Sequence, residues 1–567
     1  MKKLILCAGV FTSLLLSSCN SSTENEVEAL PFQSKEDGKW GMVQTDGKLL
    51  FEEEFLECPT VARNGRFMVK NANNLWEIYT VDKKPRQVGK DEYLGITSFC
   101  ADVTPAVKKG ERITLIDKNG KVKATLDKAG GHNIQRCYGF HEGYARIYTD
   151  KGYGLINTSG KVVIEPNYCE MFDCSDGKVI AIESKYANED ENKRPYVVLD
   201  TSGKVLYTIK AGKYDKLGSD YCTGYKHGRL IASQEEDGER KSGLLDDKGE
   251  VALKLSEKNR WIIDLAEKNF IFYDGEGCGL KNYDGEVIIR AKYNELTFDS
   301  CAPTVLWARD GNKWTLLDLE DNEITKEEYT AFCHFYDGKH AFVRISSREI
   351  GMIDLSGKEM RDLPDIYDIS INDGDEYVES DYIDADALIE AFNITSTSIG
   401  NFRIDMSPKQ AVQIWAKENN ESGDLEPDYF IQKFLSYNKE SEGVTIKYSL
   451  YYESNMAIKK SSSWWEYDYQ WADIKPSAIF LSTNGAKMTG NIDQIYGKLL
   501  TKIKSMGKPL KERSSAIVVT VAGGRGIILE KLSGNIHISL YGSDEYKTVP
   551  IADEDVQRTN GTDEYVD

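Results

Sequence analysis

The first two thirds of the sequence repeat a short phrase at intervals of about 36 to 46 residues. The phrase is apolar and ends in a turn pair, and a clear copy is Gly351–Gly357 (GMIDLSG). Its copies begin at Gly41, Glu77, Thr114, Gly154, Val197, Gly243, Gly279, Thr315 and Gly351. The last three steps are each 36 residues. Self-similarity at this period predicts one small structural unit copied in a stacked or radial array.

Each unit is predicted to consist of short β-strands. The phrase leads into pairs such as Asn119-Gly120 and Asp284-Gly285, which supply the positive-φ positions that a tight hairpin needs. A second strand follows, as in Val287–Ile289, and a third precedes the next copy, as in Tyr144–Ile147. Three or four strands per unit match a propeller blade, so we expect a β-propeller-like array, with an open β-solenoid as the alternative. Nine units is a high count for a closed ring, so the weak copy at Glu77 is expected to be a distorted blade or a cap.

Two stretches of the sequence resemble a known repeat family. Lys39-Trp40-Gly41 followed by Asp46-Gly47-Lys48, and GLIN at 154–157 followed by GKVVIEPNY at 160–168, resemble the WG β-repeat of bacterial secreted proteins and lipoproteins. The resemblance covers residues 33–380. It implies architecture and compartment only, because the family has no agreed enzymatic activity. The aromatic residues at its repeated position, Trp40, Tyr153 and Trp314, are predicted to pack between units rather than to form a binding surface.

The N-terminus resembles a lipoprotein signal. Two lysines precede the 13-residue apolar stretch Leu4–Leu16, which is too short to span a bilayer, and Leu16-Ser17-Ser18-Cys19 resembles a lipobox. The resemblance implies that residues 1–18 are a signal peptide and that Cys19 carries thioether-linked diacylglycerol and an acyl chain such as palmitate. The alternative is an ordinary secretory signal. Residues 19–32 are expected to be a flexible tether.

The predicted location is the bacterial cell envelope. Asn20 after the lipid cysteine favours the outer membrane by analogy, and Glu24, Glu26 and Glu28 loosely resemble export signals of Bacteroidetes lipoproteins. Whether the protein faces outward stays open. The net charge of −21 disfavours nucleic acid as a partner, so the expected partners are the membrane, through the lipid, and a glycan or an envelope protein.

The repeated sequence pattern ends near Asp381, and residues 381–551 are predicted to form a smaller α+β domain. Helices are expected over 384–393, from Pro408 with Ser407 as the N-cap, and over 492–506. Strands are expected over 444–452, 516–521, 527–532 and 536–541. Residues 552–567 are expected to be a disordered acidic tail.

No catalytic or metal-binding motif is present in the sequence. The nine cysteines from Cys58 to Cys333 contain no CxxC pair, and the six histidines form no HExxH. We therefore predict no catalytic residues, no metal and no cofactor. The cysteines are interpreted as small buried residues at one repeat position, with disulfides between neighbouring units as the alternative.

One segment of the second domain is a candidate ligand-binding site. Residues 461–471 (SSSWWEYDYQW) hold five aromatic residues, namely Trp464, Trp465, Tyr467, Tyr469 and Trp471. Exposed rings stack on sugar faces, and Glu466 and Asp468 could bond hydroxyl groups; the alternative is that the rings fill the domain's own core.

The sequence as a whole predicts a non-catalytic, lipid-anchored envelope protein whose repeat array binds a glycan or a protein, or acts as a scaffold for another lipoprotein. The alternative is an envelope hydrolase with its chemistry in residues 381–550. A catalytic domain would present a pocket with convergent polar groups, and a binding protein would present a flat aromatic or charged face.

Overall fold

The computed structural model of the chain describes residues 26–360, 363–420, 434–451, 476–485 and 488–551. The chain divides into two compact units, Met1–Ser380 and Asp381–Asp567. The signal peptide with Cys19, the aromatic segment 461–471 and the acidic tail lie outside the described residues. The expectation of a flexible tether over residues 19–32 is wrong for its last part, because residues 27–32 belong to a paired strand whose Leu30 and Phe32 are buried. Within the described residues, no helix has both the length and the apolar character required to cross a membrane.

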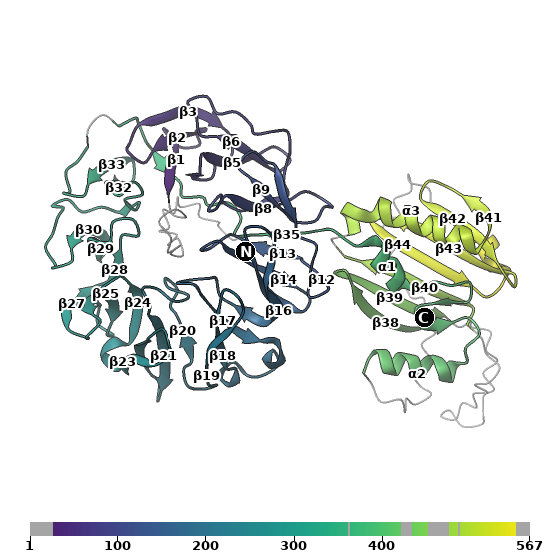
Figure 1. Cartoon of the computed structure of the whole chain (residues 1–567). Coiled ribbons are helices and arrows are strands. Elements are labelled where there is room, and N and C mark those ends of the chain that lie inside the picture. Colours follow the sequence, from purple (N-terminus) through teal and green to yellow (C-terminus); the bar gives the residue numbers. More distant parts are fainter. Residues whose placement is uncertain (1–25, 361–362, 421–433, 452–475, 486–487, 552–567) are drawn as a thin grey trace, which may run out of the picture. The chain divides into compact units, whose positions relative to one another are not determined.

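The first unit is a ring of small antiparallel sheets, as expected for a β-propeller-like repeat fold (Figure 1). We group the strands into blades 1 to 9, of which blades 1 and 2 share one hydrogen-bonded sheet and blades 4 and 5 share another, and each anchor phrase overlaps one strand of one blade. Blade 1 contains β1 (Val27–Gln33), β2 (Trp40–Gln44) and β3 (Leu49–Phe55), and blade 2 contains β4 (Ala62–Arg63), β5 (Arg66–Lys70) and β6 (Trp76–Thr80). Blade 3 contains β7 (Gly95–Ile96), β8 (Val103–Val107), β9 (Thr114–Asp117) and β10 (Val122–Thr125). Blade 4 contains β13 (Arg136–Tyr138), β14 (Tyr144–Thr149), β15 (Gly152–Asn157) and β16 (Val162–Met171).

The remaining blades follow in the same order along the chain. Blade 5 contains β17 (Lys178–Glu183), β18 (Tyr196–Asp200) and β19 (Val205–Ile209), and blade 6 contains β20 (Lys216–Leu217), β21 (Leu230–Glu236), β22 (Glu239–Leu245) and β23 (Val251–Ser256). Blade 7 contains β24 (Trp261–Leu265), β25 (Asn269–Tyr273), β26 (Cys278–Asn282) and β27 (Val287–Tyr293). Blade 8 contains β28 (Glu295–Phe298), β29 (Val305–Asp310) and β30 (Lys313–Asp318), and blade 9 contains β31 (Ala331–Phe332), β32 (His340–Ser346) and β33 (Glu349–Asp354). A two-stranded hairpin, β11 (Lys128–Ala129) and β12 (His132–Asn133), lies between blades 3 and 4.

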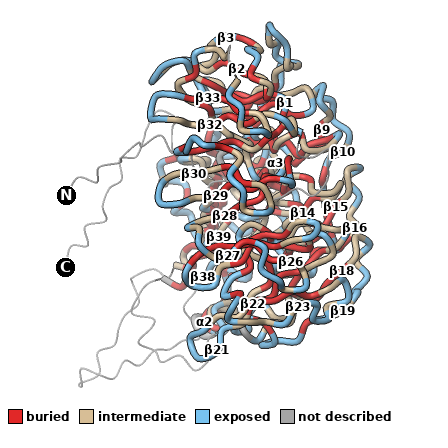
Figure 2. Tube along the Cα trace, turned by 90° about the vertical axis from the view of Figure 1, so that its left-hand side faces the viewer, coloured by how far each residue is buried: buried red, intermediate tan, exposed pale blue. Residues whose placement is uncertain are grey.

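The core of the first unit is divided among the interfaces between blades. Successive residues of a strand point to opposite faces of its sheet, so each blade can pack on both neighbours. On β15, Leu155 packs with Val179 of blade 5, whereas Ile156 packs with Leu115 of blade 3. The described residues form nine such clusters, one for each pair of adjacent blades. Buried residues accordingly follow the strands, and exposed ones concentrate in the turns (Figure 2).

The ring is closed. Leu30 and Phe32 of blade 1 share a hydrophobic cluster with Phe342 and Met352 of blade 9. Blade 2, which the sequence predicts to be a distorted blade or a cap, packs on both neighbours and is therefore not a cap. Its strand β6 leads into a longer loop, which the Thr80 amide closes by donating to the Arg86 carbonyl at 3.0 Å. Because every blade has two neighbours, no sheet face of the array is left without a partner within the described residues.

A segment after blade 9 fastens this closure, and we call residues 366–380 the strap. Its strand β34 (Asp368–Ile369) pairs with β1, and β35 (Tyr377–Glu379) pairs with β13 of blade 4. Between these strands, the Asp375 carboxylate accepts hydrogen bonds from the Trp76 indole at 2.8 Å and from the Ile96 amide at 3.2 Å. The strap thereby joins the end of the array to its first four blades.

The glycine that follows the aromatic residue in Trp40-Gly41 and Tyr153-Gly154 is required for steric reasons. A Cβ atom added to Gly154 would lie 2.6 Å from the carbonyl oxygen of Ile164 on the next strand. The strand register shifts around this position, so the two backbones approach more closely than a side chain allows. The preceding residue, Tyr153, lies opposite Tyr168, and Trp40 lies opposite Phe55 in the same way. A buried or half-buried aromatic pair therefore accompanies the close approach.

The hairpin turn after the phrase is held by one repeated side chain. In seven blades an Asp or Asn oxygen accepts the backbone N–H groups two and four residues later. Asn157 and Asn282 hold two of these turns. The other five are held by what we call the turn aspartates, namely Asp117, Asp200, Asp246, Asp318 and Asp354. Such side-chain-to-backbone bonding is why Asx residues favour turns.

The second unit is an α+β fold built on one antiparallel sheet. The strand order is β38-β39-β40-β44-β43-β42-β41, and the helix α3 (Met488–Met506) packs on the last four of these strands. The sheet contains β38 (Phe434–Ser441), β39 (Val444–Tyr451), β40 (Ala478–Asn484), β41 (Gly507–Glu512), β42 (Ala516–Val521), β43 (Arg525–Leu532) and β44 (Asn535–Tyr541). The other elements are α1 (Ala385–Phe392), β36 (Ser398–Ile399), β37 (Phe402–Arg403) and α2 (Pro408–Glu418). One hydrophobic cluster joins the three helices to the sheet.

Local sequence signals account for the helix starts in this unit. The Ser407 side chain and Gln410 form a reciprocal capping box, and Pro408 occupies the first turn of α2. The Asp384 side chain accepts from the amides of Asp386 and Ala387 at the start of α1. The helix α3 begins at Met488, earlier than the predicted residue 492.

Candidate functional site

The predicted ligand-binding residues are not placed by the structure. Trp464, Trp465, Tyr467, Tyr469 and Trp471 all lie outside the described residues, as does Cys19. The aromatic segment and the lipid attachment therefore stay predictions. A candidate site has to be sought in the described parts of the two units.

Five of the nine described cysteines are buried packing residues, and Cys58, Cys100, Cys169 and Cys301 are half-buried. No disulfide joins any of the nine described cysteines, and Cys137, Cys222 and Cys333 are buried. Burial raises the pKa of Cys222 and of Cys333 to about 12. Because the thiolate is the reactive form, these two thiols are poor nucleophiles at neutral pH.

A pocket of about 390 Å³ lies among blades 6, 7 and 8, and we call it the blade 6–8 pocket. Its volume falls in the lower part of the range of roughly 300–1,000 Å³ that small-ligand sites occupy. In Figure 1 its elements, β20, β24, β25 and β28, are neighbours along the lower left of the ring. The lining consists of Lys216, Gly218, Ser219, Asp220, Tyr221, Ser233, Trp261, Ile262, Ile263, Tyr273, Cys278, Asn294, Glu295, Leu296 and Thr297.

One wall of the blade 6–8 pocket is aromatic. Trp261 at the start of β24 lies directly opposite Tyr273 at the end of β25, so cross-strand pairing places the two side chains next to each other. Trp261 is 40% exposed, which is unusual for so large an apolar side chain. The Arg240 guanidinium lies 3.9 Å from the centroid of its ring and supports it by a cation–π contact.

The charged lining residues, which we call the polar wall, have their charges balanced. Lys216 forms an ion pair with Asp220 at 2.8 Å, and Arg309 forms one with Glu295 at 2.7 Å. Burial and the nearby carboxylates Glu295 and Asp220 raise the pKa of Tyr221, which keeps its hydroxyl protonated at neutral pH. Among the described residues that hydroxyl has no hydrogen-bond partner. The pocket therefore combines an apolar ring, an available donor and paired charges.

No sequence pattern predicts this pocket, because its residues come from three repeat units. Trp261 stands outside the repeated anchor phrases, and Tyr221 is one of many tyrosines. The only local hint is that Trp261 begins a strand at a position where the neighbouring units carry no tryptophan. Knowing which units are adjacent is what brings Tyr221, Trp261 and Glu295 together.

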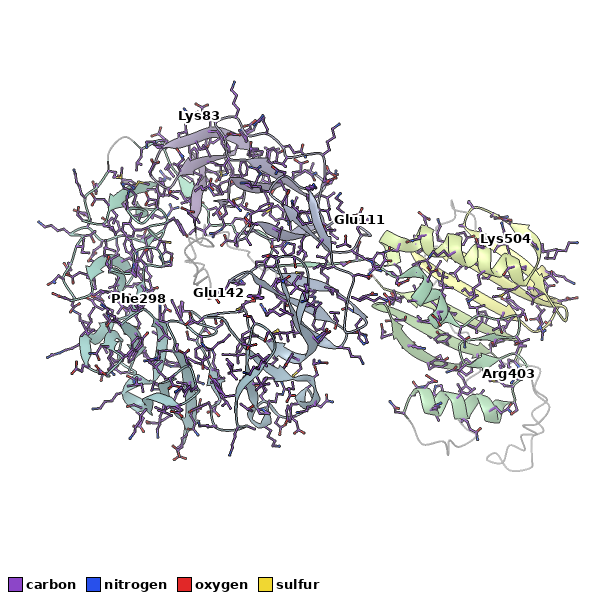
Figure 3. All side chains as sticks on the ribbon, in the orientation of Figure 1. Lys83, Glu111, Glu142, Phe298, Arg403 and Lys504 are labelled. Carbon is purple, nitrogen blue, oxygen red and sulfur yellow. The ribbon has the colours of Figure 1, made fainter. Side chains whose placement is uncertain are left out.

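A second hollow of about 740 Å³ lies at the inner edge of blades 1 to 4. Two of its acidic side chains, Glu28 and Glu142, join neighbouring blades. The Glu28 carboxylate accepts the Gly65 amide at 2.7 Å, and the Glu142 carboxylate accepts the amides of Asp176 and Gly177, each at 2.9 Å. Figure 3 shows Glu142 at the inner edge of the ring, whereas Lys83 lies at its outer rim. These acids therefore act as bridges between the turns of successive blades.

No metal centre is found in the described parts of the chain, where no group of three His, Cys, Asp or Glu side chains is placed to hold an ion. In the second unit, the described groups with clearly shifted pKa are three tyrosines, Arg403 and Lys547. Burial raises the pKa of Tyr437 to about 12, where the ring stacks on Tyr448 in the core. The raised pKa of Tyr437 thus results from the packing of its ring in the core.

Comparisons with known proteins give a local family match. Residues 153–183, which include all of β15 but its first residue and the whole of β16 and β17, match the family described as WG containing repeat. A search of curated proteins finds no match.

Three solved structures are similar to the chain at low identity. A crystal structure of a eukaryotic initiation factor shares 12% identity and a TM-score of 0.42, covering 62% of this chain and 98% of that one. The C-terminal WD40 domain of Sif2 shares 10% identity and a TM-score of 0.29, covering 51% and 92%. A KlHsv2 variant with loop 6CD replaced by a Gly-Ser linker shares 8% identity and a TM-score of 0.27, covering 56% and 95%.

The fold assignment rests on the strand pairing and on the nine interfaces of the first unit. A β-repeat fold of this kind suits a binding or scaffold role, since its many turns present surface on a rigid frame. Residues 153–183 thus match the WG containing repeat, and they lie within a first unit that has a β-propeller-like fold.

Proposed function

We propose that this protein is a non-catalytic binding or scaffold protein of the bacterial cell envelope, anchored through lipid on Cys19. The observation that carries the binding role is the closed ring of nine blades, which buries its sheets in one another and leaves turns and one aromatic pocket for contact with a ligand. The expected ligand is a glycan or another envelope protein.

Support for the anchor comes from the sequence. The basic start, the 13-residue apolar stretch and Leu16-Ser17-Ser18-Cys19 fit a lipoprotein signal in order and spacing. More than one acyl chain on Cys19 would give stable attachment, whereas a single chain binds a membrane only marginally.

Metabolic labelling with an alkyne palmitate analogue tests the anchor. The wild-type chain should take up the label and stay with the membranes, and Cys19→Ser should lose both properties. Cys58→Ser is the matched control and should retain both, because Cys58 is a half-buried cysteine that follows β3 of blade 1 and lies outside the signal sequence. Equal labelling of wild type and Cys19→Ser would contradict the proposal.

Affinity capture tests the binding role. The full lipidated chain is used as bait in detergent-solubilised envelopes, with the heat-unfolded chain as the control. A protein or glycan enriched only by the folded chain is expected. Turnover of an envelope substrate by the purified chain would instead support the hydrolase alternative and contradict the non-catalytic assignment.

A further inference from the structure

The blade 6–8 pocket has the features of a small-ligand site. It has a built-in aromatic wall, an unpartnered hydroxyl donor and a volume of about 390 Å³. Trp261 and Tyr273 are held in place by strand pairing, so the apolar wall is formed before any ligand arrives. A preformed wall reduces the ordering cost of binding.

The charges of the pocket indicate which ligands fit. Each carboxylate at the polar wall already has a cationic partner, Lys216 for Asp220 and Arg309 for Glu295. A cationic ligand would compete with these ion pairs, and an anionic one would meet two carboxylates. A neutral ligand avoids both costs, and the paired carboxylates can still accept hydrogen bonds through oxygen lone pairs.

The hydrogen-bonding groups then require hydroxyls on the ligand. The Tyr221 hydroxyl and the Trp261 indole N–H have no hydrogen-bond partner among the described residues, so both can donate to the ligand. The carboxylates of Glu295 and Asp220 are acceptors. A ligand that both donates and accepts around an apolar face meets all of these groups at once.

We propose that the blade 6–8 pocket binds a neutral saccharide unit, with the apolar face of the sugar ring against Trp261 and its hydroxyls on Tyr221 and Glu295. This inference rests on the proposed function and specifies its ligand class. It places glycan binding in the first unit, apart from the aromatic segment 461–471.

The test uses the full chain and four neutral disaccharide probes, namely cellobiose, maltose, chitobiose and mannobiose. Each is titrated to about 10 mM by isothermal titration calorimetry, so that millimolar dissociation constants are detected. N-acetyl-lysine methylamide serves as the cationic probe. At least one disaccharide should bind, and the cationic probe should not.

Two variants locate the binding. Trp261→Ala removes the stacking surface and should weaken binding by about tenfold or more. Tyr221→Phe removes only one hydroxyl and should weaken binding by about threefold to tenfold, the effect of one lost hydrogen bond. The matched controls are Leu206→Ala, at 42% exposure, and Tyr148→Phe, and both should bind as wild type does.

The outcomes separate this inference from the proposed function. If no disaccharide binds, if the cationic probe binds in their place, or if both pocket variants bind as wild type, the saccharide assignment is wrong. Envelope capture by the same chain would then still support a binding role. Should Trp261→Ala unfold, Tyr221→Phe decides alone, because it leaves the ring and its packing intact.

Discussion

Asp299 joins blades 8 and 9, and its removal tests how the blades are held together. Its fully buried carboxylate follows β28 and accepts the amides of Cys301 at 3.0 Å and Ala302 at 2.9 Å. It also accepts the Trp307 indole N–H at 3.1 Å and, from blade 9, the Phe335 amide at 3.1 Å. Asp299→Ala would leave these four donors, three of them buried and the Cys301 amide half-buried, without their acceptor. It would also remove the partner of His334 Nδ1, which lies 3.2 Å from the carboxylate.

The size of the effect follows from the number of orphaned donors. Each buried unsatisfied group costs about 1–3 kcal/mol, and the local structure relaxes to satisfy some of them, so we expect a loss of about 4 kcal/mol. At about 2 °C per kcal/mol for a large unit, the apparent Tm of the first unit should fall by about 8 °C.

Thermal unfolding followed by tryptophan fluorescence measures this, because Trp307 is buried against Phe332 at a ring distance of 4.2 Å. Asp299→Asn retains one acceptor oxygen and should fall between wild type and Asp299→Ala. The exposed Asp310→Ala, on the adjacent strand, is the control and should unfold as wild type. A shift below about 2 °C for Asp299→Ala would refute the reasoning, since that is the effect of only one kcal/mol.

Three further predictions address the repeat, the strap and the turns. Gly154→Ala should destabilise the first unit by about 2 kcal/mol or more in thermal unfolding, because the added Cβ would lie 2.6 Å from the Ile164 carbonyl oxygen. The control is Gly139→Ala, whose added Cβ has its nearest neighbour at 4.0 Å, and equal stability of the two variants would contradict this reasoning. Asp375→Ala should cost about 1–3 kcal/mol and speed amide exchange across 366–380, and unchanged exchange would mean that the bonds to Trp76 and Ile96 do not hold the strap. The backbone amides of Glu250 and Lys248 donate to Asp246 and lower its pKa, and the pKa of each of the other four turn aspartates is also lowered. The ionised turn aspartates therefore stabilise the folded state above about pH 4, and this stabilisation is lost as the pH falls through their folded-state pKa values. Replacing all five turn aspartates with Asn, the residue already present at 157 and 282, should flatten the fall of Tm below pH 4, and an unchanged slope would contradict the assignment.

The repeat architecture could be predicted because its signals are local. The turn pairs and the apolar phrase recur along the chain, and each copy forms a strand, which a tight turn follows in every copy except the one at Glu77. The glycine of Tyr153-Gly154 and the aromatic at Tyr168 were visible in the sequence, and the structure supplies their common cause, a close approach of two strands.

The strap and the pocket could not be predicted, because both depend on contacts between distant segments. The strap lies against blades 1 to 4 although it follows blade 9 in the chain. In the second unit, the edge strand β41 (GKPLKE) has no alternating pattern, since it is exposed and carries the charges and the proline that edge strands tolerate. Single-sequence patterns carry none of this non-local information.

Closure of the ring is the central claim, and amide hydrogen exchange of residues 367–370 tests it most directly. The Tyr367 amide donates to the Gln33 carbonyl at 2.7 Å, and the Ser370 amide donates to the Pro31 carbonyl at 3.0 Å. A closed ring predicts that these two amides exchange slowly, at rates close to those of the interior strand β15. Complete exchange of both amides within seconds, while β15 stays protected, would show that the last blade is not joined to the first.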